Sequence, residues 1–512
     1  MRNTLQLFDF SKKINYKNEI LAGFTVAMTM IPESLSFAIL AGLSPLIGLY
    51  AAFMMGLVTA VLGGRPGMVS GGAGATIVVL IALIKSHGVE YFFATVVLAG
   101  IFQLMVGIFK LGKFVRLIPQ PVMYGFLNGL AVIIFMAQVE QFKTVDASGV
   151  VTWLQGSALY VMLGLTALTI GIVYFFPKIT KVIPASLVAI IVVFAIVLGF
   201  NINTKTVADI ANISGNLPNF HIPKIPFSLE TLQIIFPYAM IMAGVGLIES
   251  LLTLSMVDEI TDSKGSANKE SVAQGLANIT NGFFGGMGGC AMVAQTLVNL
   301  NAGSRARLSG IFASVTILII ILVGAPFIEK IPMAALVGVM MMVAVSTFQW
   351  VSVRIVNKMP KSDIFVGVTV ALITILLHNL ALAVLVGVII ASLVFAWDNA
   401  KRIRARKYID DSGVKYYEIS GPLFFGSVTA FTDKFDPKND PDEVVVDFKE
   451  SRIVDMSAID AVDKLSKKYS QNNKKLYLKH LSEDSRKMLK NAEAVIEVDI
   501  QDDPTYKVMP GS

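Results

Sequence analysis

One acidic residue and one hydroxyl residue inside an apolar segment could together bind a cation. Glu249 lies in the stretch VGLIESLLTLSMVDE, and Thr253 follows it by one turn on the same helix face. Charged side chains within membrane segments are costly and mark functional sites by default. A carboxylate and a hydroxyl at this spacing suit Na⁺, or the carboxyl could take up a proton. The sequence therefore predicts a coupling-ion site at Glu249 and Thr253, with a structural hydrogen bond to Glu249 as the alternative.

A second acid, Glu33, lies in TMIPESLSFAIL, where the preceding proline is expected to break the first span. Glu33 could gate protons or line the site, or it could cap the helix that restarts after the proline. Phe37, one turn further on, could close the pocket or serve packing. His87 and His378 lie near span ends without metal-ligand spacing, and we expect both to be structural.

Two glycine-rich stretches interrupt the apolar sequence at equivalent places in its two halves. They are GGRPGMVSGGAGATIVVL at 63–80 and GGMGGCAMVAQTLVNL at 285–300. Each is a glycine-rich lead-in to a short helix, a pattern that indicates the binding site of an inverted-repeat transporter. Non-helical backbone at membrane depth is tolerated only inside protein or beside a water-filled cavity. The alternative is that these glycines serve close helix packing.

Two facing helix N-termini can bind an anion without a lysine, because each offers unpaired N–H groups and about half a positive charge. Small residues at these points let the backbone approach the ligand. We therefore predict an anion site formed by Ala73, Gly74 and Ala75 on one side and by Ala291 and Met292 on the other.

The composition is that of a polytopic membrane protein: 54% of residues are hydrophobic and 15% are charged, against about a quarter charged in soluble proteins. The one cysteine, Cys290, excludes an internal disulfide and is expected to be a small packing residue without a partner.

Breaking the apolar runs at proline, glycine and charge gives about fourteen segments. The clearest are 92–110, 121–138, 157–176, 183–200, 233–254, 309–326, 363–377 and 381–397, whereas 73–84 and 290–300 are too short to span a membrane. Seven spans per half is an odd number, so the two repeats, about 20–200 and 230–398, must be oppositely oriented.

Loop charges predict a cytoplasmic N-terminus. Residues 1–19 lack the apolar core of a cleavable signal. In this orientation the positive-inside rule is satisfied, because the cytoplasmic loops hold Arg65, Lys110, Lys113, Arg116, Lys178, Lys181, Lys264, Lys269, Arg305, Arg307, Arg354, Lys358 and Lys361. An even number of spans returns the basic run Lys401, Arg402, Arg404, Arg406 and Lys407 to the cytoplasm. The net charge of +6 fits these loops and needs no nucleic-acid partner.

Charged residues become dense after AWDNAKRIRARK, which separates a transmembrane domain, 20–398, from a cytoplasmic domain, 407–512. In the second, YYEISGPLFFGSV and DEVVVDFKESRIVDMSAIDAVDKLSKKY predict two strands and an amphipathic helix. KKLYLKHL and SEDSRKMLKNA add a strand and a helix, so a small α/β domain with one sheet is expected. It has no P-loop and no metal-ligand cluster, so ATP-driven transport is not supported.

Several long motifs resemble the SulP family of anion permeases over nearly the whole chain: IPESLSFAILAGLSPLIGLYAAF, GGMGGCAMVAQTLVNLNAGSRARLSG and IPMAALVGVM. The resemblance implies a uracil-permease-like fold of two inverted seven-segment repeats, divided into core and gate domains, and elevator-like movement of the core. SGPLFFG and VDMSAID resemble a STAS domain, with Ala458 in place of the usual glycine. Ser457 matches the residue phosphorylated in soluble members. We expect the tail to mediate dimer contacts or regulation instead.

In the resembled family the substrate lies between the N-termini of the third and tenth segments. The corresponding residues here are Ala73, Gly74, Ala75 and Thr76, and Ala291, Met292, Val293 and Ala294. Members of the bicarbonate branch hold sodium with an acid and a hydroxyl one turn apart, which Glu249 and Thr253 match, with Glu in place of Asp. That branch has threonines on both half-helices, where this chain has alanine and valine, which argues against bicarbonate. Animal exchangers carry an arginine where Gln295 stands, and a bound cation could replace that charge, which favours symport.

The leading interpretation is a secondary active transporter of sulfate or bicarbonate, coupled to Na⁺ or H⁺ through Glu249. It is expected to be a multi-pass homodimer of the inner membrane with no cofactor besides the coupling ion. A dicarboxylate carrier is an alternative, although no basic residue is found for a second carboxylate. Another is a membrane anion sensor that signals through its STAS domain without net flux. An enzyme is not expected, because no nucleophile–base pair or metal site falls in the apolar half.

Overall fold

The computed structural model describes residues 15–112, 119–145, 151–180, 184–209, 216–377, 380–491 and 499–501. Lys113, Arg116, Lys181 and His378, for which a place in the topology was predicted, lie outside these residues. The chain forms two compact units, Met1–Val388 and Ile389–Ser512, and the division falls within the last apolar helix.

Most of the first unit is built from apolar helices. Among the described residues, eight are long and apolar enough to cross a membrane: α1 (Tyr16–Leu40), α2 (Pro45–Leu62), α5 (Val89–Ile108), α6 (Gln120–Glu140), α7 (Gly156–Phe175), α9 (Leu229–Thr261), α12 (Leu308–Glu329) and α16 (Leu380–Ala400). Shorter helices are α8 (Ala185–Gly199), α10 (Ala267–Phe283), α13 (Met333–Thr347), α14 (Trp350–Arg354) and α15 (Lys361–Leu377). A small hairpin, β2 (Lys143–Val145) and β3 (Val151–Trp153), and the 3₁₀ turns η2 (Phe176–Lys178), η3 (Val207–Asp209) and η4 (Val356–Lys358) lie in the connections. Each of the eight clearest predicted segments coincides with a helix, which confirms the polytopic α-helical fold.

The prediction that Pro32 breaks the first span is wrong. Helix α1 continues through Pro32, and the hydroxyl of Ser36 donates a hydrogen bond to the Pro32 carbonyl oxygen at 2.7 Å. The proline leaves the carbonyl oxygen four residues earlier, that of Met28, without its helical N–H donor. Membrane helices tolerate this where neighbouring helices or hydroxyl side chains supply the missing hydrogen bond. Glu33 therefore lies within a helix, and the alternative that it caps a restarted helix is excluded.

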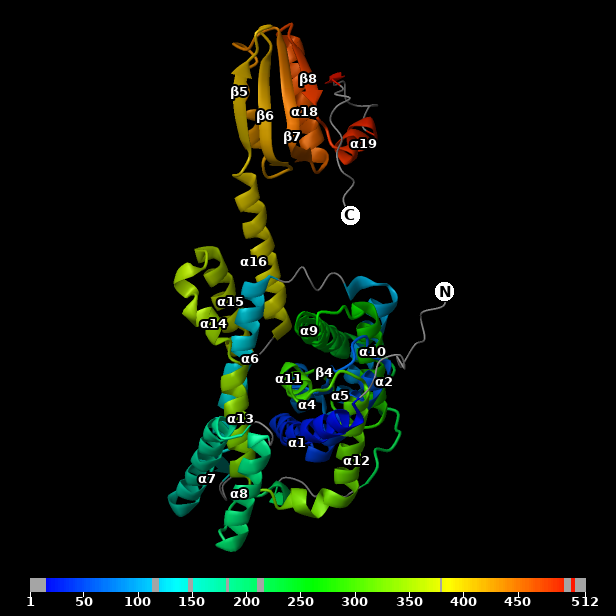
Figure 1. The fold of residues 1–512 in the computed structure, drawn as a ribbon, viewed down its shortest axis with the longest axis vertical. Helices are drawn as coiled ribbons and strands as arrows, with labels where there is room; N and C mark the ends of the chain where they lie inside the picture. Colours follow the sequence, from blue (N-terminus) through cyan, green and yellow to red (C-terminus); the bar gives the residue numbers. More distant parts are fainter. Residues whose placement is uncertain are drawn as a thin grey trace. The chain divides into compact units, whose positions relative to one another are not determined.

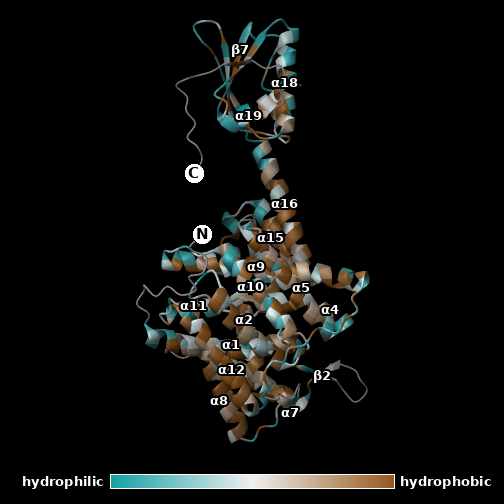
Figure 2. Cartoon of the chain, turned by 90° about the vertical axis from the view of Figure 1, so that its right-hand side faces the viewer, coloured by the Kyte–Doolittle hydropathy of each residue, from teal (hydrophilic) through white to brown (hydrophobic). Residues whose placement is uncertain are grey.

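The helices of the first unit form two groups (Figure 1). Helices α1, α2, α5, α9, α10, α11 and α12 pack on one another, while α6, α7, α8, α13 and α15 form the second group. Contacts of α1 with α8 and α13 join the groups. Figure 2 shows hydrophobic residues over most of these helices, as expected for surfaces that face lipid.

Two short strands cross at the centre of the first group. Strand β1 (Ser70–Gly72) leads into α3 (Gly74–Val78) and α4 (Ile81–His87), and β4 (Gly289–Ala291) leads into α11 (Val293–Asn301). The strands pair antiparallel with Gly71 opposite Cys290. A Cβ atom at Gly289 would lie 2.2 Å from the Gly71 carbonyl oxygen, so the close approach requires glycine. The segment 73–84, predicted as one short helix, is thus divided into two helices. The segment 290–300, also predicted as a short helix, begins as a strand and continues as a helix.

The second unit is a small α/β domain, as predicted. Its five-stranded sheet has the order β5 (Arg404–Ile409), β6 (Lys415–Leu423), β7 (Glu443–Ile453), β8 (Lys475–Lys479) and β9 (Asp499–Gln501). Only β5 is antiparallel to its neighbour. Helices α17 (Val428–Thr432), α18 (Met456–Gln471) and α19 (Glu483–Asn491) complete the domain, and the apolar face of α18 contributes to a core that contains Tyr417, Phe431 and Phe448. The edge strands β5 and β9 were not expected.

Candidate functional site

The N-termini of α3 and α11 present backbone N–H groups that are not capped. Their N-cap residues, Ala73 and Met292, have no side-chain oxygen that could accept a hydrogen bond. By contrast, α9 and α10 are capped by the hydroxyls of Ser228 and Ser266. Within the described residues, no acceptor contacts the N–H groups of 74–76 or 293–295. Uncapped N–H groups with a positive helix end form an anion-binding arrangement.

The predicted substrate residues on the α11 side contribute unequally. The N–H group of Ala291 donates to Ser250 Oγ at 3.0 Å, and that of Met292 donates to the Val69 carbonyl oxygen at 2.9 Å. Both amides are therefore used within the fold. The free N–H groups belong to Val293 and Ala294, which were among the predicted residues, and to Gln295, because residues 289–291 form a strand before the helix begins.

On the α3 side, Thr76 joins the first half-helix to the residue that precedes β4. Its buried hydroxyl lies 2.9 Å from the carbonyl oxygen of Ala73 and 3.1 Å from that of Gly288. Phe37 is also buried, and a Cβ atom at Gly74 would lie 2.5 Å from its ring. The Phe37 ring thus covers Gly74, and both residues lie next to the free N–H groups of α3.

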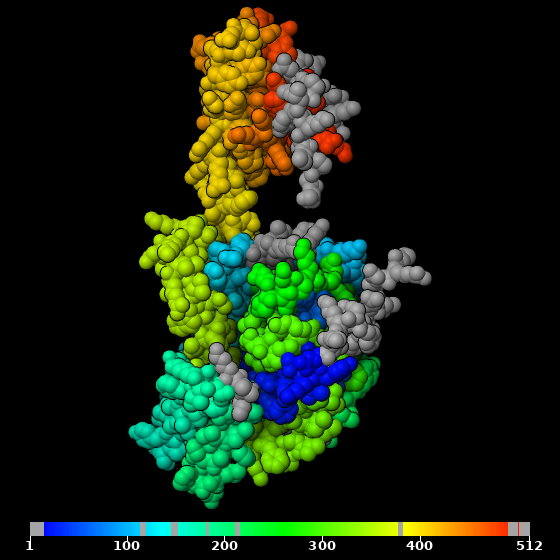
Figure 3. All heavy atoms as spheres, in the orientation of Figure 1, coloured from blue at the N-terminus to red at the C-terminus, as the bar shows by residue number. Residues whose placement is uncertain are grey.

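Helix α11 reaches the surface between α1 and α9 (Figure 3). Val293 is 43% exposed and Ala294 is also exposed, whereas Ala73, Ala75 and Thr76 are buried. The N-terminus of α11 is therefore the more accessible half of the arrangement.

The carboxylate of Glu249 contacts the crossing strands. Its Oε2 atom accepts a hydrogen bond from Cys290 Sγ at 2.8 Å, so Cys290, although buried as expected of a packing residue, has a side-chain partner that was not predicted. This contact joins residues 41 positions apart, and no local pattern in the sequence indicates it. The hydroxyl of Thr253 donates to the Glu249 backbone carbonyl at 2.8 Å and not to the carboxylate. A hydroxyl oxygen that donates its proton still has lone pairs for a cation.

Glu33 approaches the same helix end from α1. Its Oε2 atom accepts a hydrogen bond from Gln295 Nε2, and Gln295 is itself buried. Glu33 and Glu249 are only partly buried. In the part of the chain described, neither carboxylate forms an ion pair with lysine, arginine or histidine. Two carboxylates without a cationic partner thus contact this part of the chain, Glu249 at strand β4 and Glu33 at the first turn of α11.

A polar face of α10, which the sequence reasoning missed, supports both crossing strands. Gln274 Nε2 donates to Ser70 Oγ at 2.9 Å, and the Asn278 side chain bonds both the N–H and the carbonyl of Gly289, at 2.9 and 3.0 Å. These side chains are completely buried. The signal was available, because Glu270, Gln274 and Asn278 recur every four residues on one helix face.

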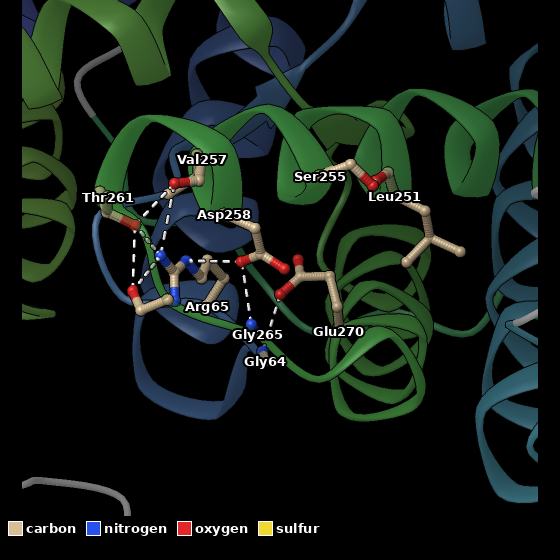
Figure 4. Close-up of polar contacts among 10 residues, drawn as sticks. Gly64, Arg65, Leu251, Ser255, Val257, Asp258, Thr261, Gly265 and Glu270 are labelled. Carbon is tan, nitrogen blue, oxygen red and sulfur yellow. Dashed lines mark hydrogen bonds and ion pairs between the residues drawn. The ribbon is translucent and has the colours of Figure 1, made fainter. Parts of the chain in front are cut away.

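The loop that leads into β1 is fixed by two acids (Figure 4). Glu270 Oε2 accepts the Gly64 N–H at 2.7 Å, and the buried Arg65 pairs with Asp258 at 3.1 Å. Asp258 also accepts the Gly265 N–H at 2.9 Å. These contacts tie the first glycine-rich stretch to α9 and α10.

Residues 16–370 match the sequence profile of the Sulfate permease family, and residues 407–505 match that of the STAS domain. The chain belongs to the sulfate permease family. It is 41% identical over 93% of its length to the "Putative sulfate transporter YbaR" of Bacillus subtilis (strain 168), of which it covers 97%. It is 29% identical to the bicarbonate transporter BicA of Picosynechococcus sp., covering 94% of this chain and 92% of BicA.

Solved structures agree with the fold. The transmembrane domain of a cyanobacterial BicA superposes with a TM-score of 0.62 at 28% identity, covering 74% of this chain and 99% of that one. Murine Slc26a9 superposes with a TM-score of 0.80 at 18% identity, and the match covers 94% of this chain and 88% of that one. The chain therefore has the fold of two inverted seven-segment repeats, and it belongs to a family of anion transporters and not of enzymes.

In this permease, Ser457 lies in the first turn of α18 and is exposed. The side chain of Asp455 caps that helix by accepting the Ala458 N–H at 2.9 Å, and it also accepts the Phe425 N–H at 2.8 Å. Asp455 therefore joins the loop after β6 to the start of α18, two residues before Ser457.

Proposed function

We propose that this permease is a secondary active transporter that moves a small inorganic oxyanion in symport with Na⁺ or H⁺. The observation that carries the proposal is the free N–H groups of α3 and α11 next to two carboxylates without a cationic partner. The N–H groups bind the anion in place of lysine or arginine. Val293, Ala294 and Gln295 provide the accessible half.

The two carboxylates supply the reason for coupling. An anion that binds beside ionised Glu33 and Glu249 is repelled by both, and this repulsion is strong where water is scarce. Binding of a cation or proton at Glu249 removes part of that charge, so the anion and the cation bind better together than alone. Thr253 supplies a further oxygen ligand to Na⁺, and Cys290 orients the carboxylate. Glu33 is the candidate for a proton.

Sulfate is the favoured anion, and bicarbonate is the second candidate. The YbaR protein, named for sulfate, is more similar to this chain than BicA, which is named for bicarbonate. Ala73 and Val293 also lack the hydroxyls expected at bicarbonate sites. A dicarboxylate would need a basic residue for its second carboxylate.

The movement that we propose is elevator-like. The half-helices, Glu33 and Glu249 all belong to the helix group that contains α1, α9 and α11, so the anion and its coupling ion are carried together past α6, α8 and α13. We propose that the protein forms a homodimer in the inner membrane, with its N-terminus and STAS domain in the cytoplasm.

The test is uptake of radiolabelled sulfate and bicarbonate into proteoliposomes with an inward Na⁺ gradient, an inward proton gradient, or neither. Concentrative uptake of one anion driven by one gradient supports the proposal and identifies the coupling ion. Uptake that equilibrates without either gradient would rule out coupling. Binding without accumulation would make the protein a sensor, and accumulation of labelled succinate in place of both anions would make it a dicarboxylate carrier.

A further inference from the structure

The segment KRIRARK, residues 401–407, is a compact basic cluster directly after the last apolar helix. Five of its seven residues are lysine or arginine, and the nearest acidic residues in the chain are Asp398 and Asp410. All five basic side chains are exposed, whereas Ile403 is buried and anchors the segment to the core of the second unit.

The position of the cluster relative to a bilayer follows from the covalent chain. Residues 382–400 of α16 are apolar enough to cross a membrane, and Figure 2 shows the hydrophobic residues along this helix. Trp397, 63% exposed, lies one turn before the helix ends, and Lys401 Nζ lies 4.6 Å from the centre of its ring. Exposed tryptophan and flanking lysine are characteristic of the membrane–water interface. The first basic residues after α16 therefore lie at the level of the lipid headgroups.

The five cations differ in the partners that the protein gives them. Lys407 donates to the Lys434 carbonyl oxygen and lies over the Tyr417 ring. Arg406 lies opposite Glu418 in the β5–β6 register, whereas Arg404 lies opposite Ser420.

The three cations nearest the membrane, Lys401, Arg402 and Arg404, form no ion pair with a carboxylate in the described part of the chain. Exposed cations without acidic partners at headgroup level are attracted to anionic lipids.

We propose that Lys401, Arg402 and Arg404 bind the phosphate groups of anionic phospholipids in the bilayer that α16 crosses. The contact fixes the junction between α16 and β5 to the membrane surface and makes the STAS domain responsive to the charge of the surrounding lipid. The inference does not depend on which anion the permease transports.

The experiment uses full-length protein with Trp153→Phe and Trp350→Phe, which leaves Trp397 as the single tryptophan. The protein is reconstituted in phosphatidylcholine bilayers that contain brominated phosphatidylglycerol or brominated phosphatidylcholine, and quenching of Trp397 gives the relative affinity of the two lipids. We expect a preference for phosphatidylglycerol of at least about fivefold at low salt. The preference, expressed as the ratio of the affinities for phosphatidylglycerol and phosphatidylcholine, should fall toward one in 0.5 M NaCl, because screening weakens exposed charge contacts.

Replacement of Lys401, Arg402 and Arg404 by Gln should bring the preference close to one. A matched variant that removes three other exposed charges of the same domain, Lys438→Gln, Lys468→Gln and Lys487→Gln, should retain it. Arg402→Lys with Arg404→Lys, which conserves charge, should retain it as well. Any of three results would overturn the proposal. The parent protein shows no preference for phosphatidylglycerol, its preference does not change with salt, or the variant without Lys401, Arg402 and Arg404 keeps the parent preference.

Discussion

Glu249 is the side chain on which the proposed coupling depends, and its replacement by Gln tests that role. We expect Glu249→Gln to fold normally but to lower gradient-driven uptake by more than about tenfold, equivalent to about 1.4 kcal/mol, because a neutral amide has no negative charge to attract Na⁺ and cannot take up a proton. Glu259→Gln, an exposed position on the same helix, is the control and should transport normally. Normal driven uptake by Glu249→Gln would remove this residue from the mechanism.

Cys290 acts on Glu249 through a single donor, Sγ to Oε2 at 2.8 Å. In Cys290→Ala the carboxylate of Glu249 loses that donor. The ionised carboxylate with no cation bound is then less stable than in the parent protein, so a cation binds to it more tightly. The cation concentration for half-maximal uptake should therefore fall by about 3- to 10-fold, equivalent to about 0.7–1.4 kcal/mol, the net effect of one ordinary hydrogen bond, because a thiol is a weak donor, while the maximal rate changes little. Cys290→Ser retains a donor and should restore the parent value. A variant series that changes only the maximal rate would mean that Cys290 serves packing.

Among the elements, the pairing of β1 with β4 makes the site possible, and it depends on the absence of side chains. In Gly289→Ala the new methyl group meets the Gly71 carbonyl oxygen, a backbone atom that cannot turn aside. We expect a loss of about 1–3 kcal/mol in stability and no measurable uptake. Gly244→Ala is the control, because nothing lies within 4 Å of its new methyl group. Thermal unfolding in detergent and uptake assays would compare the two, and equal behaviour would show that the strands can separate without loss.

The long apolar helices were predictable because length and composition determine them. The crossing strands were not predictable, since a glycine-rich strand of three residues is too short to show a periodic pattern. Strand β5 was missed because RARKYI has no alternating apolar pattern. The glycine-rich stretches did indicate where the candidate site lies. Its chemistry depends on contacts that are distant in sequence, such as Cys290 with Glu249 and Gln295 with Glu33, which only the tertiary structure brings together.

At the scale of the whole molecule, the C-terminal unit has its own core and a buried acidic centre. Asp440, 4% exposed, pairs with Lys415 at 2.5 Å and accepts hydrogen bonds from the hydroxyls of Tyr417 and Tyr469. Burial alone would raise the pKa of Asp440, but the hydrogen bonds from Lys415, Tyr469 and Tyr417 outweigh it and hold the pKa below its ordinary value.

A carboxyl whose pKa is lower in the folded state stabilises the fold above its unfolded pKa of about 3.9, and that contribution is lost as the pH falls. Asp440→Asn should therefore cost about 2–4 kcal/mol near pH 7, and less near pH 3. Urea unfolding of residues 401–512, followed by circular dichroism at both pH values, measures this. Asp433→Asn, at an exposed position, is the control. An equal loss at both pH values would assign the effect to shape and not to charge.

The β1–β4 pair also has a consequence for how the chain is made. Its strands come from opposite repeats, and Ser70 pairs with Ala291, which is synthesised 291 − 70 = 221 residues later. At about 5–20 residues per second, the first half-helix waits roughly 10–40 s for its partner strand. During that time its uncapped amides and unpaired strand lie in a nascent half-protein. An insertion factor that shields the first repeat should therefore be needed until the second repeat arrives, and ribosome stalling before residue 291 should leave the first repeat sensitive to protease.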